Sequence, residues 1–157
     1  MGRAEARPLR VLIVEDEALL AMQIEQLLLE AGHEPVGHAM EADEAFELAR
    51  ETRPDLVLVD LHLRDGLSGA EVMRTLTREY GAAGLFLTAN RRLIPEDFAG
   101  ALGVIAKPFA EAAFLQALGY VVRHLAREAA RRPPSSLELA PGRRPGRDED
   151  RAGAAAG

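Results

Sequence analysis

The sequence predicts an α/β fold in which five short strands alternate with five helices and form a parallel sheet covered on both faces. Three observations support this prediction. Apolar runs of strand length alternate along the chain with segments whose apolar residues have helical spacing. The run Leu56–Val59 shows no polar alternation, as expected for a strand buried on both sides. With 157 residues, 48% of them hydrophobic, the chain can bury one substantial core.

The first half of the chain supplies two strand–helix pairs. Leu9–Val14 is an apolar run of strand length, and Ala18–Ala31 carries its apolar residues on one helical face. Gly32 follows this helix, at a position where a helix C-terminus favours left-handed backbone. Pro35–Ala39 is a weaker strand candidate, and Glu41–Glu51 again has helical spacing.

The second half continues the alternation. The strand Leu56–Val59 follows a Pro-Asp turn signal, and Ser68 is suited to cap the next helix, whose apolar face ends at Tyr80. The remaining elements are predicted to be strand Leu85–Thr88, a short and weakly patterned helix Arg91–Gly100, strand Val104–Ala106 and a last helix Ala110–Arg132.

The two ends of the chain differ in composition from the middle. Residues 1–8 are predicted to be a flexible leader, and residues 9–132 to be the folded domain. Residues 133–157 consist mainly of Pro, Gly, Ala, Ser, Arg and acidic residues, which predicts a disordered low-complexity tail.

Composition and charge exclude several classes of function. The net charge of −6 argues against a chain whose main role is to bind nucleic acid or an anionic membrane. The absence of cysteine excludes disulfide scaffolds, thiolate zinc sites and cysteine nucleophiles. No apolar run is long enough to span a bilayer, and no signal peptide is evident, so we expect a cytoplasmic protein that contacts neither membrane nor nucleic acid directly.

Polar side chains follow the predicted strands where the strands end. Glu15 and Asp16 follow the first strand, Asp60 ends the third, Thr88 ends the fourth, and Lys107 follows the fifth. Open parallel sheets bind ligands at this edge, and adjacent strands lie only ~4.8 Å apart. We therefore expect acids, a hydroxyl and an ammonium group to converge there.

The acidic side chains suggest a metal site. Neighbouring carboxylates repel one another, and a hard divalent cation such as Mg²⁺, which prefers oxygen ligands, relieves that repulsion. Asp16 and Asp60 are candidate ligands, and Glu15 is suited to hold a metal-bound water. Glu17 is better explained as a solvated acid at a helix N-terminus.

Lys107 is the only lysine in a chain that has 18 arginines. A lysine retained against such a bias suggests that its position needs a compact ammonium group, which a planar guanidinium does not replace.

These residues lie in four motifs that resemble the receiver domain of bacterial response regulators, of the chemotaxis response regulator type. The motifs are LIVEDE (Leu12–Glu17), PDLVLVDLHLRDGLSG (Pro54–Gly69), FLTAN (Phe86–Asn90) and AKPF (Ala106–Phe109). The resemblance extends from about Leu9 to Arg127, and we expect no output domain after it. It implies a flavodoxin-like receiver fold, with a doubly wound five-stranded sheet of strand order 2-1-3-4-5.

The resemblance also implies a role for each acid. Asp60 is the expected phosphoacceptor. Glu15, Asp16 and Asp60, together with the backbone carbonyl of His62, are the expected ligands of a Mg²⁺ cofactor.

Three further residues take roles from the resemblance. Thr88 is the expected switch hydroxyl, which hydrogen-bonds the phosphoryl oxygen, and Lys107 is expected to pair with the phosphoryl group. Pro108 is expected to follow a cis peptide bond, which is the minority isomer of X–Pro bonds.

The implied function is that of a single-domain response regulator in a two-component or phosphorelay system. A sensor histidine kinase or a histidine phosphotransfer protein would supply the phosphoryl group. The domain would catalyse its own phosphorylation and dephosphorylation and no other reaction. A downstream protein would bind the face formed by helix 4, strand 5 and helix 5.

The chain departs from the receiver pattern at Val104, where most receivers carry a Tyr or Phe that rotates with the switch hydroxyl. A subgroup without this aromatic tends to carry Phe-Ala-Thr-Gly around the threonine, whereas this chain has Phe86-Leu87-Thr88-Ala89. How the switch is read without the aromatic is therefore left open by the sequence.

Two alternatives stay open. A degenerate receiver would bind proteins without phosphorylation, although the complete set of acid, Asp, Thr and Lys argues against it. A small α/β nucleotide-binding enzyme would need a Gly-rich loop after the first strand, where this chain has Glu15-Asp16-Glu17 instead.

Overall fold

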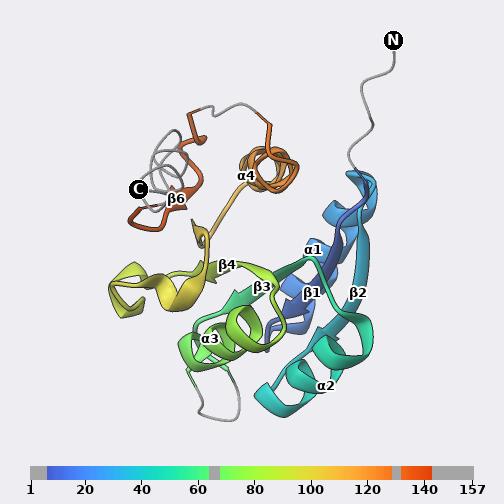
Figure 1. Ribbon diagram of the computed structural model, residues 1–157. Helices are drawn as coiled ribbons and strands as arrows, with labels where there is room; N and C mark the ends of the chain where they lie inside the picture. Colours follow the sequence, from blue (N-terminus) through green and yellow to red (C-terminus); the bar gives the residue numbers. More distant parts are fainter. Residues whose placement is uncertain (1–6, 64–67, 129–131, 143–157) are drawn as a thin grey trace, which may run out of the picture.

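A computed structural model describes residues 7–63, 68–128 and 132–142, which form one six-stranded sheet in the order β2-β1-β3-β4-β5-β6 (Figure 1). The strands are β1 (Arg10–Val14), β2 (Glu34–Ala39), β3 (Leu56–Asp60), β4 (Ala83–Thr88), β5 (Gly103–Ala106) and β6 (Glu138–Leu139). The helices are α1 (Ala18–Glu30), α2 (Ala42–Thr52), α3 (Gly69–Glu79), α4 (Glu111–Leu125) and two 3-10 turns, η1 (Arg91–Leu93) and η2 (Phe98–Gly100). The predicted α/β architecture is confirmed, and its five strands have the order 2-1-3-4-5.

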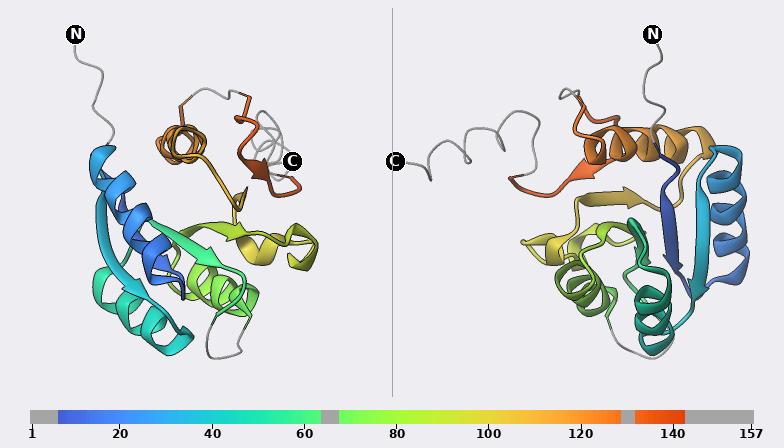
Figure 2. Two further views of the ribbon diagram at one scale, coloured as in Figure 1. Left: turned by 180° about the vertical axis from the view of Figure 1, so that it is seen from behind. Right: turned by 45° about the vertical axis from the view of Figure 1, so that its right-hand side comes forward.

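The sheet is covered on both faces because successive residues of its buried strands point to opposite sides. Along β1, Val11 and Ile13 pack with α1 and α4, whereas Leu12 and Val14 pack with α2 and α3. The two views of Figure 2 show these pairs of helices on opposite sides of the sheet. All five residues of β3 are buried, as its continuous apolar sequence predicts.

Local signals place several element ends correctly. Gly32 has a φ of 83° directly after the first helix, which is the left-handed backbone expected there. The hydroxyl oxygen of Ser68 accepts a hydrogen bond from the backbone N–H of Glu71 and caps α3.

The segment predicted as one helix over Arg91–Gly100 consists instead of η1 and η2. Pro95 has no N–H to continue a helix, and it disfavours helical backbone at Ile94, which has φ −74° and ψ 129°. Phe98 and Ala99 then adopt positive φ angles of 53° and 50°. The prediction of five helices is therefore corrected to four α-helices and two 3-10 turns in the part of the chain described.

The last helix is shorter than the predicted Ala110–Arg132. It ends at Leu125, after which Arg127 has a φ of 57° and the N–H of Glu128 donates to the carbonyl of Arg123. Residues 126–128 are good helix formers but include no large apolar side chain to pack, so propensity alone does not extend the helix through them. None of the helices within the described residues combines the length and apolarity needed to cross a membrane.

Residues 133–142 correct the prediction of a disordered tail. Leu137 and Ala140 are each only 4% exposed, and β6 pairs antiparallel with β5. The sheet therefore has a sixth strand, which the few apolar residues of this segment (Leu137, Leu139 and Ala140) did not indicate. Residues 143–157 of the predicted tail and most of the predicted leader lie outside the described residues.

Candidate functional site

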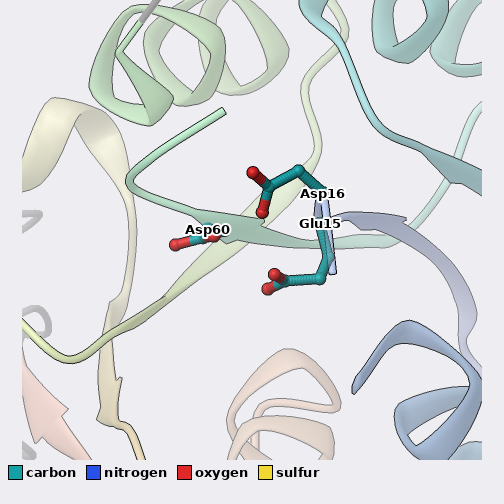
Figure 3. A group of neighbouring side chains, drawn as sticks. All are labelled: Glu15, Asp16 and Asp60. Atoms are coloured by element: carbon teal, nitrogen blue, oxygen red, sulfur yellow. The ribbon is translucent and has the colours of Figure 1, made fainter. Parts of the chain in front are cut away.

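Three carboxylates meet at the carboxyl ends of β1 and β3 (Figure 3). Glu15 and Asp16 directly follow β1, and Asp60 is the last residue of β3. One oxygen from each lies within 4.8 Å of one from each of the others. The first strand pairs in parallel with the third, so the topology brings these residues together from positions 44 residues apart (60 − 16). Among the described residues, they form the cluster that the strand ends predicted.

Lys107 links two of these carboxylates. Its Nζ lies 2.8 Å from Glu15 Oε2 and 3.6 Å from Asp60 Oδ2. The Lys107 side chain is partly buried, at 17% exposed. The peptide bond between Lys107 and Pro108 is cis, the isomer that the resemblance implies. The chain's one lysine thus lies between two strand-end acids.

Glu15 is the most buried of the three acids, at 1% exposed. Burial raises the pKa of its carboxyl group from 4.5 to about 7; the hydrogen bond from Lys107 opposes this rise, and the charge of Asp60 adds to it. The ionised form of Glu15 is therefore destabilised by its surroundings, and a further cation close to it would stabilise that form.

Thr88 ends β4 beside Lys107. Its side chain is buried, and its Oγ1 accepts a hydrogen bond from the backbone N–H of Asn90 at 2.9 Å. The backbone N–H of Lys107 donates to the carbonyl of Thr88, also at 2.9 Å. Two neighbouring strands therefore fix the hydroxyl and the ammonium-bearing residue relative to each other.

The backbone around Asp60 is tightly packed. The N–H of His62 donates to Asp60 Oδ1 at 3.3 Å, which ties the backbone of His62 to the Asp60 side chain. A Cβ added at Gly69 would lie 2.0 Å from the Asp60 carbonyl oxygen, so α3 can begin there only with glycine. In the sequence, Gly69 is identifiable only as the last residue of the second motif. Its close contact with Asp60 is decided by tertiary packing.

The structure adds one neighbour that the sequence did not indicate. His38 in β2 places its Nε2 2.7 Å from the backbone carbonyl oxygen of Glu15. A lone histidine in a weak strand carried no signal for this contact, because it depends on how β2 pairs with β1.

The arrangement fits a magnesium ion. Three carboxylates supply hard oxygen ligands from two strands, and the raised pKa of Glu15 is the response expected of crowded acids with insufficient positive charge nearby. The ligands that would hold the ion are Asp16, Asp60 and the carbonyl of His62, with Glu15 next to them.

We call the cluster of Glu15, Asp16 and Asp60 the acidic corner. Together with the buried hydroxyl of Thr88 and with Lys107 at the carboxyl edge of a doubly wound sheet, it defines a class of protein. The model of the response regulator receiver domain family matches residues 11–119. The chain belongs to this family.

Similarity to individual proteins agrees with this membership. The phyllosphere-induced regulator PhyR of Methylorubrum extorquens is 38% identical over 101 residues, which are 63% of this chain and 38% of PhyR. The transcriptional regulatory protein PdtaR of Mycobacterium tuberculosis is 38% identical over 122 residues, 74% of this chain and 58% of PdtaR. The solution structure of the receiver domain of Erythrobacter litoralis PhyR has a TM-score of 0.67 at 30% identity, covering 80% of this chain and 95% of that domain.

Family membership fixes the general role. Receiver domains are signalling modules of two-component systems rather than conventional enzymes, and they bind Mg²⁺ at an acidic pocket. They interact with kinases or phosphotransfer proteins and with downstream partners. This chain spans about two fifths of PhyR and less than two thirds of PdtaR, so the activities of those whole proteins do not transfer with the domain.

Proposed function

We propose that this receiver domain accepts a phosphoryl group from a phosphohistidine onto Asp60 and thereby changes its binding to a partner protein. The observation that carries the proposal is the position of Lys107 Nζ, between the carboxylates of Glu15 and Asp60. An ammonium group on a partly buried side chain beside a strand-end carboxylate is suited to an anionic ligand attached to that carboxylate.

The chemistry assigns one task to each residue. An oxygen of Asp60 attacks phosphorus; the new P–O bond forms as the P–N bond to histidine breaks, and the histidine nitrogen keeps the electron pair and takes a proton. Lys107 offsets the repulsion between the two anions and stabilises charge on the phosphoryl oxygens. The backbone contacts of Asp60 hold the attacking oxygen in place, which lowers the entropic part of the barrier.

Mg²⁺, held by Asp16, Asp60 and the His62 carbonyl, would supply further positive charge for the phosphoryl oxygens. Binding it also relieves the repulsion among the three acids. Water later hydrolyses the acyl phosphate and returns Asp60 to the carboxylate.

Thr88 provides the conformational response. Its hydroxyl accepts from Asn90, and it is the hydroxyl available on β4 to donate to a phosphoryl oxygen on Asp60. In doing so it would turn away from the N–H of Asn90 and release the loop that follows β4. The conformational effect of the phosphoryl group is thereby transmitted to the β4–β5 side of the domain.

Intact-mass measurement after incubation with acetyl phosphate and Mg²⁺ tests the proposal. Wild type should gain about 80 Da, the mass of one phosphoryl group replacing a proton. Asp60→Asn should show no gain, and chelation of Mg²⁺ should suppress the gain in wild type.

The matched control is Asp43→Asn, the same change at an exposed acid in the first turn of α2, which should gain mass like wild type. An undiminished gain in Asp60→Asn would refute the assignment of the acceptor. No gain in wild type would favour a binding module that works without phosphorylation.

A further inference from the structure

Residues 132–142 form a C-terminal strap that returns to the free edge of the sheet (Figures 1 and 2). Within it, Gly103 of β5 pairs with Leu139, and Val104 pairs with Glu138. The N–H of Ala140 donates to the carbonyl of Leu102 at 2.8 Å. The strap therefore covers β5 at Val104, the position where most receivers carry the switch aromatic.

The docking combines a small apolar contact with two polar ones. The side chain of Leu137 is buried in the core layer formed with α1 and α4. The hydroxyl of Ser136 donates to the carbonyl of Ala113 in α4 at 2.8 Å. Arg91 of η1 binds Glu138 through two contacts of 2.9 Å each. With only two residues in the strand, this interface is short enough to open without unfolding the domain.

One edge of the interface connects directly to the candidate site. Thr88 Oγ1 accepts from the N–H of Asn90, and the next residue, Arg91, holds Glu138 of the strap. Turning the Thr88 hydroxyl toward Asp60 would break the first of these bonds and free the loop that positions Arg91. A short chain of contacts through Thr88, Asn90, Arg91 and Glu138 thus connects the end of β4 with the strap.

We propose that the β5 edge is a strand-docking site, which residues 137–140 of this chain occupy while Thr88 is bonded to Asn90 and leave when Asp60 is phosphorylated. This inference rests on the proposed function. It accounts for a switch without an aromatic at Val104, because the moving element is the strap rather than a rotating ring. Release uncovers backbone groups of β5 that a further strand can pair with.

Gly103 offers a selective way to undock the strap. A Cβ added there would lie 2.3 Å from the Glu138 carbonyl oxygen and 3.2 Å from Leu137 Cδ1, so the nearest clashes are all with the strap. The matched control is Gly119→Ala in α4, where an added Cβ meets nothing within 4 Å. Both changes add one methyl group to the same domain.

The test is amide hydrogen exchange of the full chain, read at residues 137–140, with intact mass recorded on the same samples. With Mg²⁺ and acetyl phosphate, the phosphorylated chain should exchange these amides at least about tenfold faster, while β1 and β3 stay protected. Gly103→Ala should exchange them fast without phosphorylation, and Gly119→Ala should behave like wild type.

Linkage supplies a second readout. If phosphorylation releases the strap, an undocked strap must favour the phosphorylated form to the same extent. Gly103→Ala should therefore bind the phosphoryl mimic beryllofluoride several-fold more tightly than wild type and Gly119→Ala.

Charge reversal tests the route through Arg91. Glu138→Arg should release the strap, and the double variant Arg91→Glu/Glu138→Arg should restore its protection. Unchanged exchange in Glu138→Arg would overturn this route. If Gly103→Ala does not fold, Glu138→Arg is the variant that tests whether an undocked strap exchanges faster.

The outcomes separate the two proposals. A mass gain with unchanged exchange at residues 137–140 overturns strap release and leaves the proposed function standing. No mass gain overturns both. Faster exchange in the phosphorylated chain that is absent from Asp60→Asn supports both.

Discussion

The acidic corner at the ends of β1 and β3 and the covered edge of β5 are built in opposite ways. In the corner, Glu15, Asp16 and Asp60 lie at the ends of two buried five-residue strands, and their positions are set by pairing within the parallel core. At the edge, a two-residue strand is held by the buried side chains of Leu137 and Ala140, a few hydrogen bonds and one surface ion pair.

This difference suggests a division of labour. A reaction centre needs groups held rigidly, and the buried strands provide that. A response needs an element of low local stability, and the strap, with few buried side chains, provides that. The two regions meet at Thr88 and Arg91, so changes confined to one region should separate chemistry from response.

The largest effect is expected from Gly69→Ala in the acidic corner. The added Cβ would lie 2.0 Å from the carbonyl oxygen of Asp60 and 2.6 Å from Leu61 Cα, and neither backbone atom can move without disturbing β3. We expect the free energy of unfolding to fall by about 3 kcal/mol or more, together with loss of phosphorylation. Urea denaturation measures this, and a loss below about 1 kcal/mol would show that the backbone around Asp60 can accommodate the added methyl group.

A smaller loss is expected from Leu137→Ala in the strap. Removing a buried leucine side chain commonly costs about 2–5 kcal/mol, but the loss here is limited because the strap can detach while the rest of the domain stays folded. We expect about 2 kcal/mol with phosphorylation retained. Leu29→Ala, at a leucine 57% exposed, is the control and should cost less than about 0.5 kcal/mol. Equal losses in both variants would contradict the docking of the strap.

The corner should also show a distinctive pH dependence. Since the pKa of Glu15 is raised from 4.5 to about 7, the folded state binds more protons than the unfolded state between these values. In Mg²⁺-free buffer, this contribution to stability is fully present below pH 4.5 and is lost as the pH rises through 7, at up to about 1.4 kcal/mol per pH unit for one proton.

Thermal midpoints recorded between pH 5 and 8 test this dependence. Glu15→Gln should remove the slope, and saturating Mg²⁺ should reduce or reverse it because the ion favours the ionised form. A wild-type slope that persists in Glu15→Gln would assign the effect to another group.

The smallest effect on stability is expected from Lys107→Arg, which keeps the charge. We expect the free energy of unfolding to stay within about 1 kcal/mol of wild type. A planar guanidinium does not match the ammonium position between Glu15 Oε2 and Asp60 Oδ2, so the response should be lost. NMR shift changes at Thr88 and Val104 on adding beryllofluoride report this. Changes of wild-type size in the variant would show that arginine replaces Lys107.

The sequence by itself determined the parallel core and the identities of the strand-end residues. Both are local in origin: an apolar run such as Leu56–Val59 predicts a buried strand, and the residue that follows it must lie at the sheet's carboxyl edge. The motifs around Asp60, Thr88 and Lys107 then predicted the family.

Tertiary structure alone decided the β5 side. Leu137 is one of two leucines in a segment rich in Pro and Ser, and it is buried only because the segment pairs with the edge of β5 and packs against the core layer of α1 and α4. Gly103 and Gly69 likewise show no sign in sequence of the backbone atoms that lie against them. Such contacts join residues far apart in the chain, and their energy comes from a complementary surface that exists only once the sheet has formed.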